Sequence, residues 1–259
     1  MPSWETASGV LLGTAEPRAT AEPRVAPALL APTERRRAPD TVAIALEVAV
    51  RACEAAGADP RCMPSVFAST HGDLPINDYM CSTLATTPML CSPTKFHNSV
   101  HNAASGYWTI GTGCAQPSTA LTAWQNTFAA GLLEALVQAV ADATPVLYVA
   151  YDVASRGPLA AVTPSDGLLA AALVLVPADQ TADARIARLR CAIEDYTAID
   201  EHGDIPRAWA DVVPANAMRQ CLPLLAALVG GSDRVLKWRL GARSILSVGV
   251  EPAERKALP

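Results

Sequence analysis

The feature that most constrains the fold of this chain is a long segment almost without charge. Between Asp78 and Glu134 the only fully charged side chain is Lys95, although Asn, Ser, Thr, Gly and His are frequent there. These polar residues interrupt every window of about twenty residues, so no membrane span fits. Charge is costly to bury, whereas paired neutral polar groups are tolerated. We therefore expect the segment inside a folded protein or at a subunit interface.

The composition favours a globular protein that does not bind nucleic acid. The 259 residues are 51% hydrophobic and 17% charged, which is enough apolar material for a sizeable core. The formal net charge is −5, and the one basic cluster, Arg35, Arg36 and Arg37, is short. A protein that reads phosphates normally gathers Lys and Arg on one face, so this charge pattern argues against a nucleic-acid partner.

The cysteines and the first residues favour the cytoplasm. Seven cysteines are an odd number, and none forms a Cys-x-x-Cys pair, which is typical of reduced thiols in a cytosolic chain. The first residues hold no basic stretch followed by a long apolar one, so we expect no secretory signal.

Hydrophobic periodicity alternates between helices and strands, which predicts an α/β class. A helix is expected from Thr41 to the Gly57 that ends it. Further helices are expected at residues 77–85, 96–105 and 125–140 and in MRQCLPLLAALVGG. Strands are expected at residues 65–70, 146–151, 171–176 and 186–193 and in SILSVGV, and a short strand just before the 125–140 helix.

The N-terminal part is expected to differ from the rest. Residues 1–32 are rich in Pro, Ala and Thr and contain the near-duplicate TAEPRATAEPR, which predicts a loosely packed segment. Within it, residues 8–13 suggest an edge strand. Residues 33–259 are expected to form a single domain, with an extension of different character after about residue 208.

Three motifs follow one another in the middle of the chain. They are SPTKFHNSVHNAASG at residues 92–106, GCAQPSTALTA at residues 113–123, and a long apolar helix before the strand at Val146. In this order they resemble the N-terminal half of a β-ketoacyl synthase, over roughly residues 33–193. More narrowly, the chain is similar to short ketosynthase-like proteins of aryl polyene and related polyketide or fatty-acid clusters. The resemblance implies a thiolase-like fold, half of a ketosynthase, with a mixed sheet, helices on both faces and a buried apolar helix.

The same resemblance implies that the catalytic thiol is missing. It places Gln125, to within about one residue, where condensing enzymes carry the Cys that accepts the acyl group, with Trp124, Asn126 and Phe128 around the pocket. A thiolate at a helix N-terminus is stabilised by the helix dipole and attacks a thioester, which a carboxamide cannot do. Phe128 also replaces a small Gly, so the pocket itself is expected to be filled.

The histidines allow several interpretations. His97 and His101 have the i, i+4 spacing at which two imidazoles on one helix share a zinc ion, but a third ligand is missing, and hydrogen bonds to neutral neighbours are the plainer alternative. His71-Gly72-Asp73 after a strand suits either an acid and base or a simple turn. Condensing enzymes also use two His from the C-terminal half, and beyond residue 193 this chain has only His202. No cofactor and no metal are implied.

Two functions from different classes follow. The first is a non-condensing ketosynthase-like subunit that associates with itself, with an active ketosynthase or with an acyl carrier protein, as a homodimer or heterodimer. The second is an enzyme on acyl thioesters, a malonyl decarboxylase that uses Gln125 or a synthase active with a partner. His97 and His101 remain candidates for chemistry in either case. Arg35, Arg36 and Arg37 would form the patch that an acidic carrier protein needs.

Overall fold

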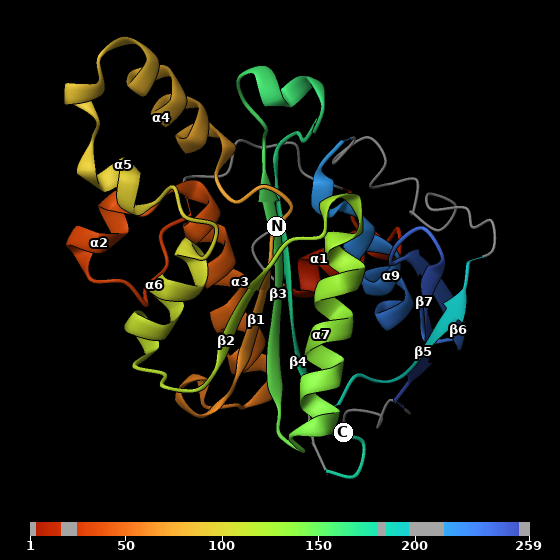
Figure 1. Cartoon of the computed structure of the whole chain (residues 1–259). Helices are drawn as coiled ribbons and strands as arrows, with labels where there is room; N and C mark the ends of the chain where they lie inside the picture. The colour runs from red at the N-terminus through yellow and green to blue at the C-terminus, as the bar shows by residue number, and fades with distance from the viewer. Residues whose placement is uncertain (1–3, 17–24, 181–184, 197–214, 254–259) are drawn as a thin grey trace. The chain divides into compact units, whose positions relative to one another are not determined.

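The computed structural model describes residues 4–16, 25–180, 185–196 and 215–253 (Figure 1). The chain separates into two compact units built on different sheets. One contains residues 22–177 and 215–219, and the other contains residues 1–21, 178–214 and 220–259. Within the part of the chain that is described, no helix is long and apolar enough to cross a membrane. The TAEPRATAEPR repeat lies largely outside the described residues, and His202 and Ala208 lie fully outside them.

The first unit is organised around a mixed sheet of four strands in the order β2-β1-β3-β4. The strands are β1 (Ser65–Ala68), β2 (Ser118–Leu121), β3 (Val146–Val153) and β4 (Leu168–Leu175). β1 runs parallel to both β2 and β3, and β4 is antiparallel to β3. The two central strands are almost wholly buried, as their continuous apolar sequence predicts. The α/β class and the mixed sheet expected from the sequence are confirmed.

Six α-helices belong to the described part of this unit. They are α2 (Pro32–Arg37), α3 (Asp40–Ala56), α4 (Leu74–Thr86), α5 (Pro93–His97), α6 (Ala103–Thr112) and α7 (Thr127–Ala141). Single 3-10 turns lie at η1 (Pro60–Cys62), η2 (Pro88–Leu90), η3 (Trp124–Asn126), η4 (Pro158–Ala161) and η5 (Ala217–Cys221), the last of which runs into the second unit.

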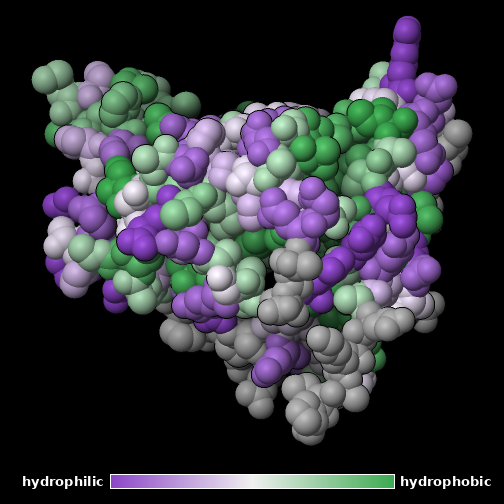
Figure 2. Space-filling view, turned by 90° about the horizontal axis from the view of Figure 1, so that it is seen from below, coloured by the Kyte–Doolittle hydropathy of each residue, from purple (hydrophilic) through white to green (hydrophobic). Residues whose placement is uncertain are grey.

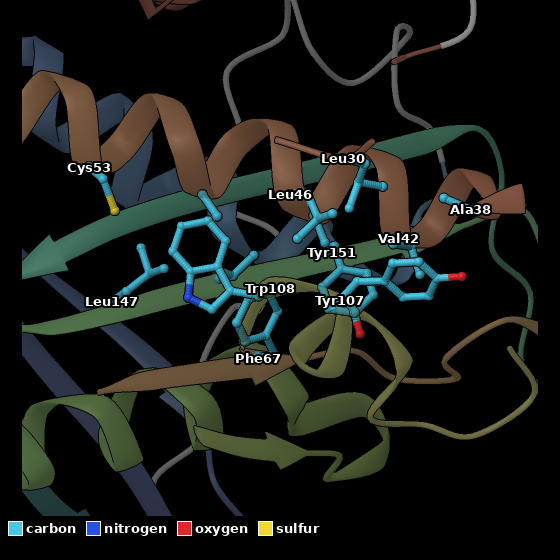
Figure 3. Packing of buried hydrophobic residues seen from close by; sticks show 14 of the residues in the cluster. Leu30, Ala38, Val42, Leu46, Cys53, Phe67, Tyr107, Trp108, Leu147 and Tyr151 are labelled. Carbon is cyan, nitrogen blue, oxygen red and sulfur yellow. The ribbon is translucent and has the colours of Figure 1, made fainter. Parts of the chain in front are cut away.

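The main core lies on the face of the sheet that α3 and α6 cover (Figure 3). The ring of Phe67 on β1 lies 6.3 Å from that of Trp108 on α6 and 6.4 Å from that of Tyr151 on β3, centroid to centroid. Leu46 of α3 packs on this cluster and is fully buried. α3 ends as expected, because Gly57 takes the left-handed conformation at φ 62°.

α7 covers the opposite face of the sheet, so helices lie on both faces as expected. Its Phe128 packs against Tyr148 of β3, with ring centroids 5.9 Å apart, and Tyr148 Oη donates a hydrogen bond of 2.7 Å to the Phe128 carbonyl. Gly131 allows α7 to approach closely, since a Cβ there would lie 2.7 Å from Ala68 Cβ on β1. The expected buried helix is confirmed on this side, although Val137 and Val140 on its other side are exposed.

The second unit has a three-stranded antiparallel sheet in the order β5-β7-β6. Its strands are β5 (Ala187–Asp195), β6 (Arg234–Arg239) and β7 (Ser244–Pro252), and its helices are α1 (Trp4–Leu11) and α9 (Leu222–Gly230). α9 contacts β6 and β7 and packs with α1. The strand and helix expected from SILSVGV and MRQCLPLLAALVGG are therefore confirmed.

Two expectations about local structure are wrong. The edge strand expected at residues 8–13 is the end of helix α1, in which Val10 and Leu11 are buried and Ser8 Oγ bonds back to the Trp4 carbonyl at 2.7 Å. The single helix expected at residues 96–105 is two helices, α5 and α6, separated by a turn. Asn98 is the residue at which α5 ends. Its side chain is buried, and Nδ2 donates a hydrogen bond of 3.4 Å to the Arg37 carbonyl.

Candidate functional site

The candidate site lies at the carboxyl edge of strands β1, β2 and β3. Because these strands are parallel, the segments that follow them meet at one edge of the sheet, which is where α/β folds usually place their sites. Residues 69–73 follow β1, residues 122–127 follow β2, and Asp152 lies near the end of β3. Hydrogen bonds join these three segments.

Asp152 is the centre of this network. Its side chain is completely buried and accepts hydrogen bonds from Ser69 Oγ at 2.7 Å, from the Thr70 backbone N–H at 3.0 Å and from the His71 backbone N–H at 3.4 Å. Ser69 Oγ in turn accepts a bond from the Gly72 N–H at 2.8 Å. The carboxylate of β3 therefore fixes the turn that follows β1.

Two further bonds tie this turn to its neighbours. His101, just before α6, places Nε2 2.8 Å from the Ser69 carbonyl oxygen. Thr122, just after β2, donates from Oγ1 to the Thr70 carbonyl at 3.0 Å. The turn after β1 is thus held from β3, from the start of α6 and from the turn after β2.

Burial changes the acid–base properties of this cluster. It raises the pKa of Asp152, against the opposing effect of the N–H and O–H groups that bond to the carboxylate. Burial also lowers the pKa of His71 below its ordinary value of 6.5; the charge of Asp152 opposes this shift, and that of His101 adds to it. Among the described residues, the buried Nε2 of His71 has no hydrogen-bond partner. The cluster therefore favours a neutral His71.

His71-Gly72-Asp73 forms a turn that begins helix α4. Gly72 has a left-handed φ of 64°. Asp73 caps α4, since Oδ1 accepts from the Ile76 N–H at 2.9 Å, and Oδ2 accepts from Thr41 Oγ1 at 2.7 Å. Burial raises the pKa of this carboxyl group. The structure thus gives Asp73 a capping role, which is the plainer of the two interpretations of this triplet.

The strand-to-helix elbow is the sharp turn between β2 and α7, at residues 122–127. Trp124 has a left-handed φ of 53°, which is uncommon for a bulky residue. Thr127 holds this conformation: its Oγ1 donates to the Trp124 carbonyl at 2.6 Å and accepts from the Ala123 N–H at 3.0 Å. Gln125 lies at the exposed tip, and Asn126 is half-buried. The elbow therefore presents a carboxamide, not a thiol, one turn before α7.

The expected pocket residues do not all lie at this surface. The Trp124 side chain is 54% exposed, whereas Phe128 is 2% exposed and packs on Tyr148 between α7 and the sheet. Trp124, Gln125 and Asn126 are consecutive in one 3-10 turn, but Phe128 is part of the core beneath them.

The two candidate histidines do not share a helix, so the expected i, i+4 geometry is wrong. His97 is the last residue of α5, is exposed, and packs its ring 5.9 Å from that of Tyr107. His101 lies beyond the turn and belongs to the network of Asp152. No cluster of three or more His, Cys, Asp or Glu residues that suits a metal ion occurs among the described residues.

Asp152 and Thr127 are the site residues that sequence reasoning missed. Asp152 is a charged residue that directly follows the apolar run VLYVAY, and this position at the end of a strand was the available signal. Thr127 had no such signal, since its role depends on the turn that its hydroxyl closes.

Fold and site together define an α/β protein with a strand, a sharp elbow and a buried helix, in which the elbow lacks a nucleophilic thiol. The family model described as beta-ketoacyl synthase, N-terminal domain, matches residues 10–222. The chain therefore belongs to the β-ketoacyl synthase N-terminal domain family. Among curated proteins, no sequence matches it.

Solved structures share this fold at low sequence identity. A ketosynthase (ApeO) in complex with its chain length factor (ApeC), from Xenorhabdus doucetiae, matches with a TM-score of 0.66 at 22% identity, over 96% of this chain and 91% of that one. AntDE:AntF, a type II acyl carrier protein in complex with its ketosynthase, matches with a TM-score of 0.69 at 12% identity, over 96% and 93%. The ishigamide ketosynthase/chain length factor gives 0.65 at 16%, over 96% and 95%. At these identities the matches show a thiolase-like ketosynthase fold.

Proposed function

We propose that this chain is a non-condensing ketosynthase-like subunit in polyketide or fatty-acid biosynthesis of the aryl polyene type. The observation that carries the proposal is the elbow between β2 and α7. It retains a sharp strand-to-helix turn but carries Trp124, Gln125 and Asn126, with no cysteine among residues 118–128. Without a thiolate the chain has no group at this turn to accept an acyl chain from a thioester. It is not expected to condense substrates alone.

The partner we propose is an active ketosynthase subunit, an acyl carrier protein or both, as part of a homodimer or heterodimer in the cytoplasm. The similar folds were solved as complexes of a ketosynthase with a chain length factor or with a carrier protein. Large apolar side chains at Met89, Leu90 and Phe96 are also 94%, 71% and 65% exposed. Exposed apolar groups of this size often mark an interface.

The alternative is an enzyme that acts on acyl thioesters. Gln125 is exposed at the tip of the elbow, so its amide N–H can be reached by a thioester carbonyl. A decarboxylase of this kind would use the carboxamide to hold the carbonyl of a malonyl group while CO2 leaves.

A mass-spectrometric assay separates the two functions. The purified chain is incubated with malonyl and acyl thioesters of an acyl carrier protein, and both CO2 loss and covalent acylation are recorded. Gln125→Ala is compared with Gln116→Ala, which removes another exposed carboxamide from the loop before β2. We expect no turnover and no acyl adduct from any of the three proteins. Decarboxylation that Gln125→Ala abolishes and Gln116→Ala retains would replace the proposal with the enzymatic alternative.

A further inference from the structure

The three-stranded sheet of the second unit has two unlike faces. Strand register places Leu246, Val248 and Val250 of β7 on one side, where all three are buried. The other side carries two cationic side chains from each outer strand, Arg188 and Arg190 of β5 and Lys237 and Arg239 of β6; we call it the arginine face. Figure 2 shows one side of the molecule, on which hydrophilic and hydrophobic residues are interspersed.

Two ion pairs lie across the arginine face and confirm that these side chains share one side. Arg190 pairs with Glu251 of β7, and Lys237 Nζ lies 2.7 Å from Glu194 Oε2 of β5. The second pair spans the full width of the sheet, over the central strand. All four side chains are more than a third exposed, so the pairs lie on the surface.

The two remaining arginines have no acidic partner among the described residues. Arg188 is exposed and lies opposite Glu251 in the strand register. Arg239 stacks over the ring of Tyr196 at 5.1 Å and donates to the Gly241 carbonyl at 3.1 Å, both of which leave its charge unneutralised. The register sets them six residues apart along β7, roughly 20 Å at 3.3 Å per residue, and two strand spacings of about 4.8 Å apart across the sheet, so the two positions are roughly 22 Å apart.

We propose that the arginine face docks an acidic helix of a partner protein, with Arg188 and Arg239 holding carboxylates near its two ends. A span of roughly 22 Å corresponds to about fifteen residues of α-helix at 1.5 Å per residue. Arginine presents a planar fork of donors that suits a carboxylate. On the outer strand β6, at a register position between those of the two arginines, Val235 is 64% exposed and offers an apolar contact.

Charge selects a protein partner over a nucleic acid. The whole chain has a net charge of −5, which repels an extended polyanion, whereas a short acidic helix needs only a local positive patch. Among the partners of the proposed function, the acidic one is the acyl carrier protein. Its identification as the docked partner therefore rests on that proposed function. The site differs from the cluster Arg35 to Arg37, which the sequence alone suggested for the same role.

The test uses the full chain, immobilised, and a purified apo acyl carrier protein as the probe in biolayer interferometry. The double variant Arg188→Glu/Arg239→Glu is compared with Arg61→Glu/Arg156→Glu, which removes the same charge from exposed positions of the other unit. We expect the first variant to raise Kd at least tenfold and the second to change it less than twofold. Arg188→Gln/Arg239→Gln should weaken binding several-fold. Circular dichroism should show all variants folded, because Arg188, Arg61 and Arg156 are exposed and Arg239 is only half-buried.

Three results would overturn the docking proposal: no binding by the wild-type chain, unchanged binding by Arg188→Glu/Arg239→Glu, or a loss produced by Arg36→Glu/Arg37→Glu instead. Arginine-dependent binding of a 20-nucleotide RNA in place of the carrier protein would overturn it as well. Failure of the proposed function is read separately, from CO2 loss that depends on Gln125. The two failures are therefore distinguishable.

Discussion

The close packing of α7 on the sheet predicts that replacing glycine by alanine destabilises the fold at Gly131 but stabilises it at Gly106. In Gly131→Ala, the new Cβ would lie 2.7 Å from Ala68 Cβ and 2.9 Å from Tyr148 Cε2. Optimal carbon contacts lie at about 3.5–4.0 Å, so α7 must retreat from β1 by roughly 1 Å. Ala68 Cβ is fixed to the strand backbone and cannot turn aside.

The magnitude follows from two opposing terms. Alanine in place of glycine stabilises a helix interior by about 1 kcal/mol. Overpacking a close-packed core costs about 1–3 kcal/mol, and we expect the upper end because two buried groups are struck at once. The net loss in the free energy of unfolding is then about 2 kcal/mol. For a chain of this size that corresponds to a melting temperature lower by roughly 5 °C.

Gly106→Ala is the matched control. Gly106 lies inside α6, and a Cβ there would meet no atom within 4 Å. Only the helix-propensity term remains, so this variant should gain about 0.5–1 kcal/mol. Thermal and urea unfolding, followed by circular dichroism, measure both variants beside the wild type. If Gly131→Ala unfolds at or above the temperature of Gly106→Ala, the packing of α7 against β1 described above is incorrect.

Three further predictions concern the carboxyl edge of the sheet. Asp152→Ala leaves the Ser69 hydroxyl and two backbone N–H groups without their acceptor, so urea unfolding should show a loss of about 3–5 kcal/mol; a loss under 1 kcal/mol would contradict the network. His71→Gln tests the pH dependence of stability. Burial lowers the His71 pKa, so the folded state favours the neutral ring. The contribution of His71 to the free energy of unfolding is therefore present above pH 6.5 and is lost as the pH falls below that value. The melting temperature should therefore fall more between pH 7.5 and 5.5 in the wild type than in the variant. The raised pKa values of the buried Asp73 and Asp152 act in the opposite direction in both proteins, and loss of the His71 charge, a charge that lowers the Asp152 pKa, strengthens that opposition in the variant. Gln125→Cys should react with iodoacetamide faster than a cysteine placed at Gln116, because a thiol beside the N-terminus of α7 has a lowered pKa; equal rates in peptide-resolved mass spectrometry would show that the dipole of α7 does not act on position 125.

Periodicity alone predicted the elements whose formation depends on local apolar spacing. The spacing of Val42, Leu46, Ala49 and Cys53 identified α3, and the apolar run at Val146 identified β3; both elements are buried against each other in the structure. The same reasoning failed where a polar side chain decides the backbone. Asn98 ends α5 because its buried amide bonds to Arg37, far away in the sequence.

In the candidate site, too, features with a local sequence pattern were predictable and features that depend on contacts between distant residues were not. The strand before the elbow and the helix after it were predictable from local apolar patterns, whereas the position of the elbow came from the resemblance to β-ketoacyl synthases. The network of Asp152 was not predictable, since its bond to Ser69 joins residues 83 positions apart and no spacing in the sequence indicates it. His97 and His101 were paired by a helical period, whereas the structure separates them with a turn and gives only His101 a place in the network.

The elbow keeps its shape by means that do not involve a nucleophile. A bulky residue in the left-handed region, such as Trp124, costs of order 1–3 kcal/mol and persists only where its surroundings hold it. Thr127 Oγ1 supplies that hold with two hydrogen bonds, and Thr122 ties the turn to the network of Asp152. Neither contact uses the side chain of Gln125. The geometry of the turn is therefore held independently of the side chain at position 125.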